Sequence, residues 1–163
     1  MDTQDRIAIV HQFGRTYRAF MAAFESQVGQ PLPRWRIMLA LYQSNGESSQ
    51  KRLVEHLRVD PGALTRQLKL LESLGWIARS ADARDNRITN VKLTEAGRAA
   101  TEAALPRRNA FLNLTMSIPD DALAALSGAL GMMEARIGEA AGGACATHAG
   151  AAATAANEAP GCA

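Results

Sequence analysis

The chain has 163 residues, of which 47% are hydrophobic, and a formal net charge of +2. These values suit one globular unit with a core, and no apolar run approaches the roughly 20 residues that a membrane-spanning helix needs. The first residues, MDTQDRIAIV, lack the cationic start and apolar stretch of a secretion signal. We therefore expect a cytoplasmic protein that does not bind a membrane.

Two apolar helices are expected at the start of the chain. Residues 4–28 spread apolar side chains over a surface wider than one core-facing stripe. Such a helix is expected to bury one side against its own domain and another against a partner chain. Residues 33–43 form the second helix, and Glu47 and Ser48 after it give little evidence for a strand.

Residues 49–75 follow a helix-turn-helix pattern. Ser49 can cap a first helix over residues 50–57. Asp60 followed by Pro61 is a strong start signal for the second helix, because the carboxylate accepts open N–H groups and proline fits the first helical position. Gly75 tolerates the left-handed conformation that closes a helix.

The second of these helices has an apolar and a polar face. Leu64, Leu68 and Leu71 share the apolar face. Arg66 can pair bidentately with guanine, and Thr65 can meet a thymine methyl group or a phosphate. A solvated amphipathic helix would show the same division. The small, hydrogen-bonding and basic residues on the outward face are Gly62, Thr65, Arg66, Lys69 and Ser73.

Basic charge is concentrated in this part of the chain. Residues 49–92 carry nine cations and five anions, a net charge of +4, against −2 for the remainder. A surface that binds phosphates requires such a concentration. Lys51 and Arg52 lie near the start of the first of the two helices, where they can contact phosphates.

A β-hairpin is expected after Gly75, with strands over residues 76–79 and 88–93. The connecting residues 80–87 alternate acids and bases, so local ion pairs can order the tip. Arg84 has a carboxylate on each side of it in sequence. An arginine on a hairpin tip suits the narrow, electronegative minor groove of DNA, although a solvated turn is the alternative.

Several motifs in this stretch resemble those of the MarR family (multiple-antibiotic-resistance-type regulators), in the same order and at the same spacing. The likeness covers roughly residues 5–140. The matching residues are Asp60-Pro-Gly-Ala-Leu-Thr-Arg66, Leu71-Glu-Ser-Leu-Gly75, the wing motif D-x-R-D-x-R at Asp82, Arg84, Asp85 and Arg87, and Leu93-Thr-Glu-Ala-Gly97.

The resemblance implies a mainly α fold with a small β wing, which is a winged helix-turn-helix with N- and C-terminal dimerisation helices. It implies a ligand-responsive homodimer that binds a double-stranded DNA operator. In that family the arginine matching Arg84 enters the minor groove beside the acid matching Asp82, and the arginine matching Arg87 more often braces the wing.

The remaining chain is expected to be helical up to a tail. Thr94 can cap a helix over residues 94–104, Pro106 should kink or break it, and residues 107–117 resume it. A last helix over residues 119–137 has an apolar face but no core of its own. We expect this face to be covered by the first helix and by a second copy of the chain.

We expect a single domain over residues 1–141. Within it, residues 33–99 form the winged helix-turn-helix, and residues 4–30 and 100–141 form the dimerisation helices. Residues 142–163 are expected to be a disordered Ala/Gly-rich tail, into which some alanine-rich helix could extend.

The sequence shows little sign of catalysis or metal binding. It has no phosphate-cradling glycine loop, no HExxH and no GxSxG motif. Cys145 and His148 form a CxxH fragment, but a structural zinc site needs about four ligands. We therefore expect no enzyme, no cofactor and no metal.

MarR-type proteins often bind aromatic carboxylates or phenols between the first helix, the second helix and the helix after the wing. The residues of this chain that suit such a site are His11, Arg15, Tyr17, Arg18, Met38 and Tyr42. In the first helix the spacing of His11, Arg15 and Arg18 allows a shared face, and an arginine pairs well with a carboxylate. The alternative is that the arginines form ion pairs and the histidine packs in an interface.

Together with this resemblance, the sequence predicts a repressor that a small aromatic acid or phenol releases from a pseudo-palindromic operator. Two alternatives are a winged-helix module that binds protein and an architectural DNA-binding protein without a ligand.

Overall fold

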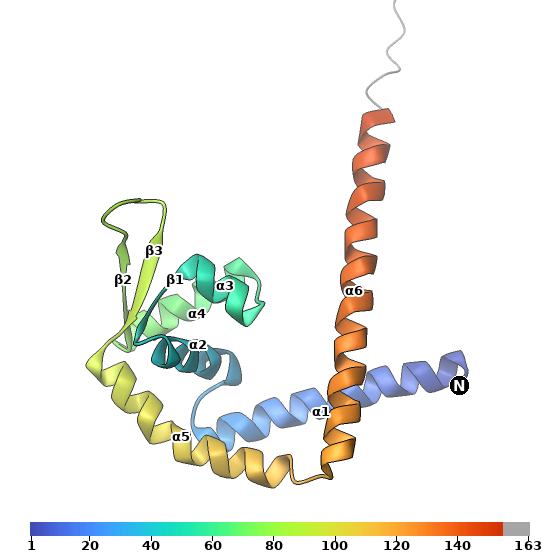
Figure 1. The fold of residues 1–163 in the computed structure, drawn as a ribbon, viewed down its shortest axis with the longest axis horizontal. Helices are drawn as coiled ribbons and strands as arrows, with labels where there is room; N and C mark the ends of the chain where they lie inside the picture. The colour runs from blue at the N-terminus through green and yellow to red at the C-terminus, as the bar shows by residue number, and fades with distance from the viewer. Residues whose placement is uncertain (155–163) are drawn as a thin grey trace, which may run out of the picture. The chain divides into compact units, whose positions relative to one another are not determined.

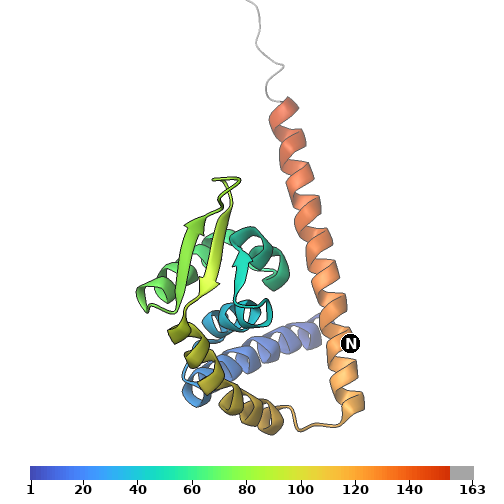
Figure 2. The same cartoon turned by 60° about the vertical axis from the view of Figure 1, so that its left-hand side comes forward.

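The computed structural model describes residues 1–154, and side chains as far as residue 140. This part of the chain is mostly helical, with one small sheet (Figures 1 and 2), as the sequence predicted. Its elements are α1 (Thr3–Val28), α2 (Leu32–Gln43), β1 (Glu47–Ser49), α3 (Gln50–Leu57), α4 (Pro61–Ser73), β2 (Ile77–Ala81), β3 (Thr89–Leu93), α5 (Glu95–Thr115) and α6 (Asp120–Thr154).

The chain divides into two compact units, Met1–Thr115 and Met116–Ala163. The first contains the helix-turn-helix and the hairpin, and the second contains α6. The expected single domain over residues 1–141 stays a prediction, because it depends on how the terminal helices pair in a dimer.

The sheet is antiparallel, with β3 in the centre between β1 and β2. In β2, Ile77 lies opposite Leu93, and in β1, Glu47 lies opposite Lys92. The strand β1 had little support in the sequence, because three polar residues carry no pattern. It forms because the edge of β3 offers backbone partners, and the N–H of Leu93 also donates to the carbonyl of Gly46 at 2.7 Å.

The leucine face of α4 lies in the main core. Leu64, Leu68 and Leu71 are at most 2% exposed and pack with residues of α2, α3 and the sheet. The predicted inward face of this helix is therefore confirmed. Met38 of α2, also fully buried, belongs to the same cluster.

A second, aromatic cluster joins α1, α2 and α5. Phe111 of α5 meets Phe24 of α1 nearly at right angles, with ring centroids 5.5 Å apart, and Phe20 lies 5.1 Å from Phe111. Trp35 of α2 is buried in the same cluster. The C-terminal half of α1 is thus the part of this helix that packs on its own domain.

The helix α5 continues through Pro106, so of the expected kink or break, the break does not occur. Proline removes one helical hydrogen bond, but side chains on both sides of it are anchored in one cluster. Ala104 before Pro106 and Phe111 after it are both buried there. This shared burial holds the two halves in one helix.

The helix α6 extends to Thr154, which corrects the expectation of a disordered tail for residues 142–154. Alanine has the highest helix propensity of all residues, and this segment is rich in it. The rest of the predicted tail, residues 155–163 with Cys162, and the side chains of Cys145 and His148 lie outside the described residues.

Gly97 is required where α5 passes the start of the hairpin. A Cβ at this position would lie 2.0 Å from the backbone oxygen of Trp76. Gly97→Ala should therefore lower the free energy of unfolding by about 3 kcal/mol, as overpacking against backbone does. Urea unfolding followed by circular dichroism measures the change.

The matched control is Gly128→Ala in α6, where a Cβ meets nothing within 4 Å. There the better helix propensity of alanine should stabilise the protein by about 1 kcal/mol. Equal effects of the two substitutions would contradict the close approach at Gly97.

Candidate nucleic-acid interface

Local signals define both ends of α4, the helix that carries the predicted outward face. The Oδ1 atom of Asp60 accepts the N–H of Ala63 at 2.7 Å, and Pro61 takes the first helical position. Gly75 follows with a φ of 71°, in the left-handed region. Both end signals are confirmed. With the leucines buried, the exposed polar residues of this helix include Gly62, Arg66, Lys69 and Ser73.

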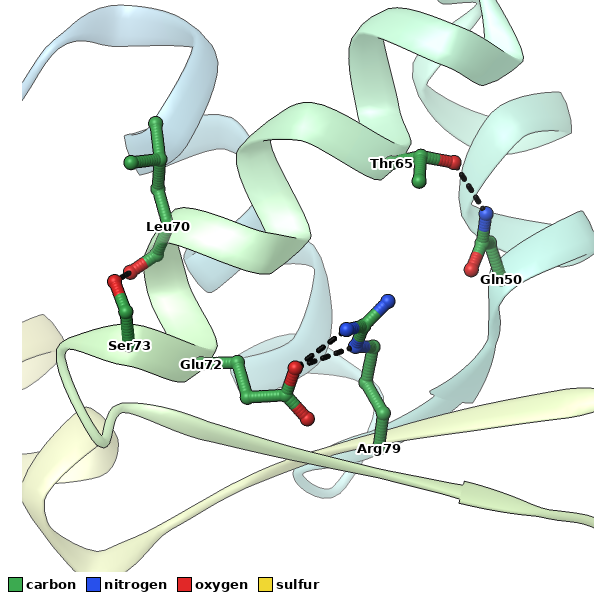
Figure 3. A network of polar contacts seen from close by, with 6 residues as sticks. All are labelled: Gln50, Thr65, Leu70, Glu72, Ser73 and Arg79. Atoms are coloured by element: carbon green, nitrogen blue, oxygen red, sulfur yellow. Dashed lines mark hydrogen bonds and ion pairs between the residues drawn. The ribbon is translucent and has the colours of Figure 1, made fainter.

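Thr65 lies closer to α3 than the helical pattern indicated. It is half-buried, and its hydroxyl donates to the carbonyl of Pro61 at 2.8 Å. The same hydroxyl accepts from the Nε2 atom of Gln50, also at 2.8 Å (Figure 3). The side chain thus joins α3 to α4. The hydroxyl of Ser73 likewise donates to the carbonyl of Leu70 at 2.8 Å. Both hydroxyls are therefore already engaged in hydrogen bonds within the protein.

Cations from α3 and from the wing line one groove. Lys51 and Arg87 both border a cavity of about 440 Å³, together with Pro61 at the start of α4. Lys51 and Arg52 are exposed in the first turn of α3, where Ser49 accepts the N–H of Arg52 at 3.2 Å. The predicted phosphate-contacting residues of α3 thus lie beside the start of α4.

The wing tip is ordered by a carboxylate that accepts three hydrogen bonds. The Oδ1 atom of Asp82 accepts the backbone N–H groups of Arg84 at 2.9 Å and Asp85 at 3.3 Å, and its Oδ2 atom accepts the Asn90 amide at 2.9 Å. The hydrogen bond from the backbone N–H of Arg84 is the main reason that the pKa of Asp82 lies below its usual value. Arg84 itself is exposed.

These bonds replace the ion pairs that the alternating charges suggested for the tip. Asp85 also accepts a backbone N–H, that of Arg87 at 2.9 Å, instead of pairing with a guanidinium. A carboxylate beside free N–H groups of a tight turn finds partners at fixed distances, whereas long exposed arginines lose side-chain entropy when they pair.

Glu72 and Arg79 form an ion pair between the last turn of α4 and β2 (Figure 3). The Nε atom of Arg79 donates to Oε2 of Glu72 at 3.0 Å, and an Nη2 atom makes a second, shorter contact to the same oxygen. The hydrogen bond from Arg79 lowers the pKa of Glu72. Arg79 counts among the basic charges of residues 49–92, but its pairing with Glu72 was not predicted, because the two residues lie in different elements.

The structure does not bring the six candidate ligand residues together. His11, Arg15, Tyr17 and Arg18 are exposed on α1. Met38 is fully buried in the main core, and the hydroxyl of Tyr42 donates to Glu102 at 3.2 Å while Arg98 covers its ring. Helical spacing places residues on one face of a helix, but it does not tell which element covers that face.

A cavity of about 330 Å³ lies between α1, α2 and the α3–α4 corner. Tyr17 alone of the candidates borders it. Arg36 contributes a cation, and its Nη2 atom donates to the carbonyl of Leu57 at 2.8 Å. The lining residues are Tyr17, Leu32, Pro33, Arg36, Ile37, Leu57, Val59, Asp60, Ala63, Leu64 and Gln67.

The described part of the chain shows neither a metal site nor a membrane-spanning helix. Within it, no three His, Cys, Asp or Glu side chains are grouped so as to hold a metal ion. None of its helices has both the length and the apolarity to cross a bilayer.

Comparison with known proteins identifies the family. Residues 31–89 match the model of the MarR family. The HTH-type transcriptional repressor Mb2911 of Mycobacterium bovis is 33% identical over 96 residues, which cover 59% of this chain and 68% of that protein. The chain belongs to the MarR family. The resemblance found in the motifs is therefore confirmed.

Two further comparisons agree with membership of the MarR family. The uncharacterised HTH-type transcriptional regulator YdgJ of Bacillus subtilis is 34% identical over 104 residues, which span 64% of this chain and 63% of YdgJ. The organohalide-sensing regulator RdhR-CbdbA1625, in a crystal structure with 2,4-dichlorophenol, matches with a TM-score of 0.72 and 18% identity over 82% of this chain and 80% of that one. At this identity the second likeness bears on the fold alone.

Asp82→Ala should loosen the wing tip, because the N–H groups of Arg84 and Asp85 lose their acceptor. Their amide hydrogens should exchange faster, as hydrogen exchange measured by NMR will show. Acid should act in the same way. The pKa of Asp82 is lowered by folding, so its contribution is present above the ordinary pKa and is lost as the pH falls through the lowered one.

Asp121→Ala is the control, because this exposed carboxylate lies outside the wing. Unchanged exchange at residues 84 and 85 in Asp82→Ala would show that the carboxylate does not order the tip.

Proposed function

We propose that this protein is a transcriptional repressor that binds a pseudo-palindromic operator as a homodimer and releases it when a small aromatic acid or phenol binds. The observation that carries the DNA-binding role is the exposed face of α4 with Arg66 and Lys69, next to the cation-bearing wing. Because the leucine face is buried, these cations face outward.

In this proposal α4 enters the major groove. Gly62 has no side chain to hold the helix away from the base edges, and Arg66 reads guanine. Lys69 and Ser73 continue the same face, and Thr65 supports it from the α3 side. Small residues near the start of the helix and cations along it match what this docking requires.

The flanking contacts are to the sugar-phosphate backbone and the minor groove. Lys51, Arg52 and Arg87 meet phosphates, since Lys51 and Arg87 already border one groove beside the start of α4. Arg84 enters the minor groove, with Asp82 holding the backbone of the tip in place.

A homodimer is supported by apolar side chains that are left exposed on helices in each of the two units. On α1, Val10, Phe13 and Tyr17 are 47–57% exposed, and the Phe13 and Tyr17 rings stack with centroids 6.4 Å apart. On α6, Met132 and Ile137 are 68% and 64% exposed. Contiguous exposed apolar surface on a monomer marks an interaction site.

The effector is proposed to occupy the cavity beside Arg36. Its volume of about 330 Å³ is within the range of small-molecule sites, and most of its lining is apolar. A guanidinium carries five N–H donors, so the bond to Leu57 leaves others for a ligand carboxylate. RdhR-CbdbA1625, which shares this fold, was crystallised with a chlorinated phenol.

Arg66→Ala should reduce discrimination between the operator and random DNA by about 1–3 kcal/mol, because a bidentate base contact is lost. Lys51→Ala should weaken both DNAs alike, and Arg84→Ala should most affect A·T-rich flanks. Fluorescence anisotropy at several salt concentrations, with a duplex from upstream of the gene, measures each affinity.

The control for the DNA variants is Arg136→Ala, which removes an exposed cation on α6 that lies outside the proposed DNA interface. Operator preference that survives Arg66→Ala would remove α4 from the role of reader. Binding to neither DNA by the parent protein would favour a module that binds protein instead.

Light scattering should show a dimer at micromolar concentration. Phe13→Glu should shift the mass toward the monomer, because it places a charge in the proposed apolar interface. Gln43→Glu, at an exposed position at the end of α2, should not. In the dimer the two copies of α4 should lie about 34–36 Å apart, one turn of DNA. A monomeric parent protein would contradict the assembly.

Benzoate, salicylate, nicotinate and phenols should be titrated against the complex with operator DNA. We expect at least one aromatic acid to dissociate it, and Arg36→Gln to remove that response. Arg15→Gln, on the exposed face of α1, serves as the charge-matched control. A response that persists in Arg36→Gln but disappears in Arg15→Gln would move the site to α1.

A further inference from the structure

We propose that the effector is a para-substituted aromatic acid with a hydrogen-bond donor opposite its carboxylate, and that Gln67 of the recognition helix accepts that donor. This inference rests on the proposed function, because it specifies the ligand of the cavity beside Arg36. It adds a direct contact between the ligand and the helix that reads DNA.

The helix α4 forms one wall of the cavity. Asp60 at its N-cap and Ala63, Leu64 and Gln67 within it all border the cavity. At 100° per residue these positions share one side of the helix, and Gly62, Arg66 and Lys69 lie on the other. A ligand in the cavity therefore contacts the side of α4 that is turned away from the proposed DNA interface.

The two polar residues on this wall differ in whether their side-chain oxygen already accepts a hydrogen bond. The Oδ1 atom of Asp60 already accepts the N–H of Ala63 at 2.7 Å. The Oε1 atom of Gln67 is buried and has no hydrogen-bond partner within the described part of the chain. Its terminal amide torsion is broad and soft, so turning Oε1 toward the cavity breaks no existing bond of that oxygen. A buried acceptor without a partner favours a ligand that brings a donor.

In this proposal the cation and the acceptor are held toward different ends of the cavity. Arg36 donates to the carbonyl of Leu57, the last residue of α3, in the turn that leads to the Asp60 cap of α4. Gln67 is seven residues further on, a rise of about 10 Å along a helix. A para-hydroxybenzoate with one hydrogen bond at each end spans about 12 Å. An ortho-hydroxyl lies beside the carboxylate and reaches only one end.

The consequence is a specific mode of release. A ligand held between Arg36 on α2 and Gln67 on α4 fixes the spacing of these two helices. Gln67 is adjacent in sequence to Arg66, so a movement at Gln67 also moves the proposed base-reading residue. By linkage, the factor by which the ligand weakens DNA binding equals the factor by which DNA weakens ligand binding.

The test compares 4-hydroxybenzoate, 3-hydroxybenzoate, salicylate and benzoate. Each is titrated against the full-length protein bound to a labelled duplex from upstream of its gene, and anisotropy reports release. In the parent protein, 4-hydroxybenzoate should act at a concentration about tenfold below that of benzoate, the effect of one good hydrogen bond. Salicylate should act like benzoate.

Gln67→Met removes the acceptor with little change in shape or helix propensity. In this variant the preference for 4-hydroxybenzoate should disappear, while benzoate still acts and DNA affinity without ligand is retained. Gln67→Leu provides a second variant if the first is unstable. Gln43→Met, an exposed glutamine of α2 outside this cavity, is the control and should keep the preference.

The outcomes separate this inference from the proposed function. If all four acids act equally, or if the para preference persists in both Gln67 variants, Gln67 does not recognise the ligand and the inference is wrong. The effector site beside Arg36 would then stand on the Arg36→Gln result. If no acid dissociates DNA from the parent protein, the proposed effector class is wrong and this inference fails with it.

Discussion

Burial of the leucine face of α4 is the constraint on which the other features of this protein depend. Each of Leu64, Leu68 and Leu71 contributes about 1.5–3 kcal/mol by leaving water, so the helix cannot rotate about its axis without losing most of this stabilisation. That fixed rotation decides which residues are exposed. It places Arg66 in solvent and Gln67 at the cavity, although the two are neighbours in sequence.

Specific contacts join α4 to the β2 strand and to α3, and a separate contact joins α5 to α2. The Glu72–Arg79 ion pair joins the last turn of α4 to β2, and Thr65 with Gln50 joins α4 to α3 (Figure 3). From α5, Arg98 covers the ring of Tyr42 at 5.4 Å.

In the proposed mechanism α4 serves two ligands on two sides. Its outward face meets DNA, and its other side borders the cavity beside Arg36. This arrangement needs no long pathway between the sites, because one rigid helix forms part of both. It also explains how a change at either site alters affinity at the other: both depend on the position of the same element.

The sequence by itself determined the local elements and the family. Asp60-Pro61, Gly75 and the leucine spacing specify α4 and its inward face, because capping and helical periodicity depend on residues close together in the chain. Tertiary structure decided what depends on distant partners. The strand β1 forms because the edge of β3 offers backbone partners. The helix α5 continues through Pro106 because side chains on both sides of it are buried in one aromatic cluster. The packing of α2 against α4 placed Arg36 and Gln67, which are far apart in the sequence, around one cavity, while Met38 and Tyr42 were taken into other contacts. Helical spacing tells which residues share a face, but only packing decides what that face meets.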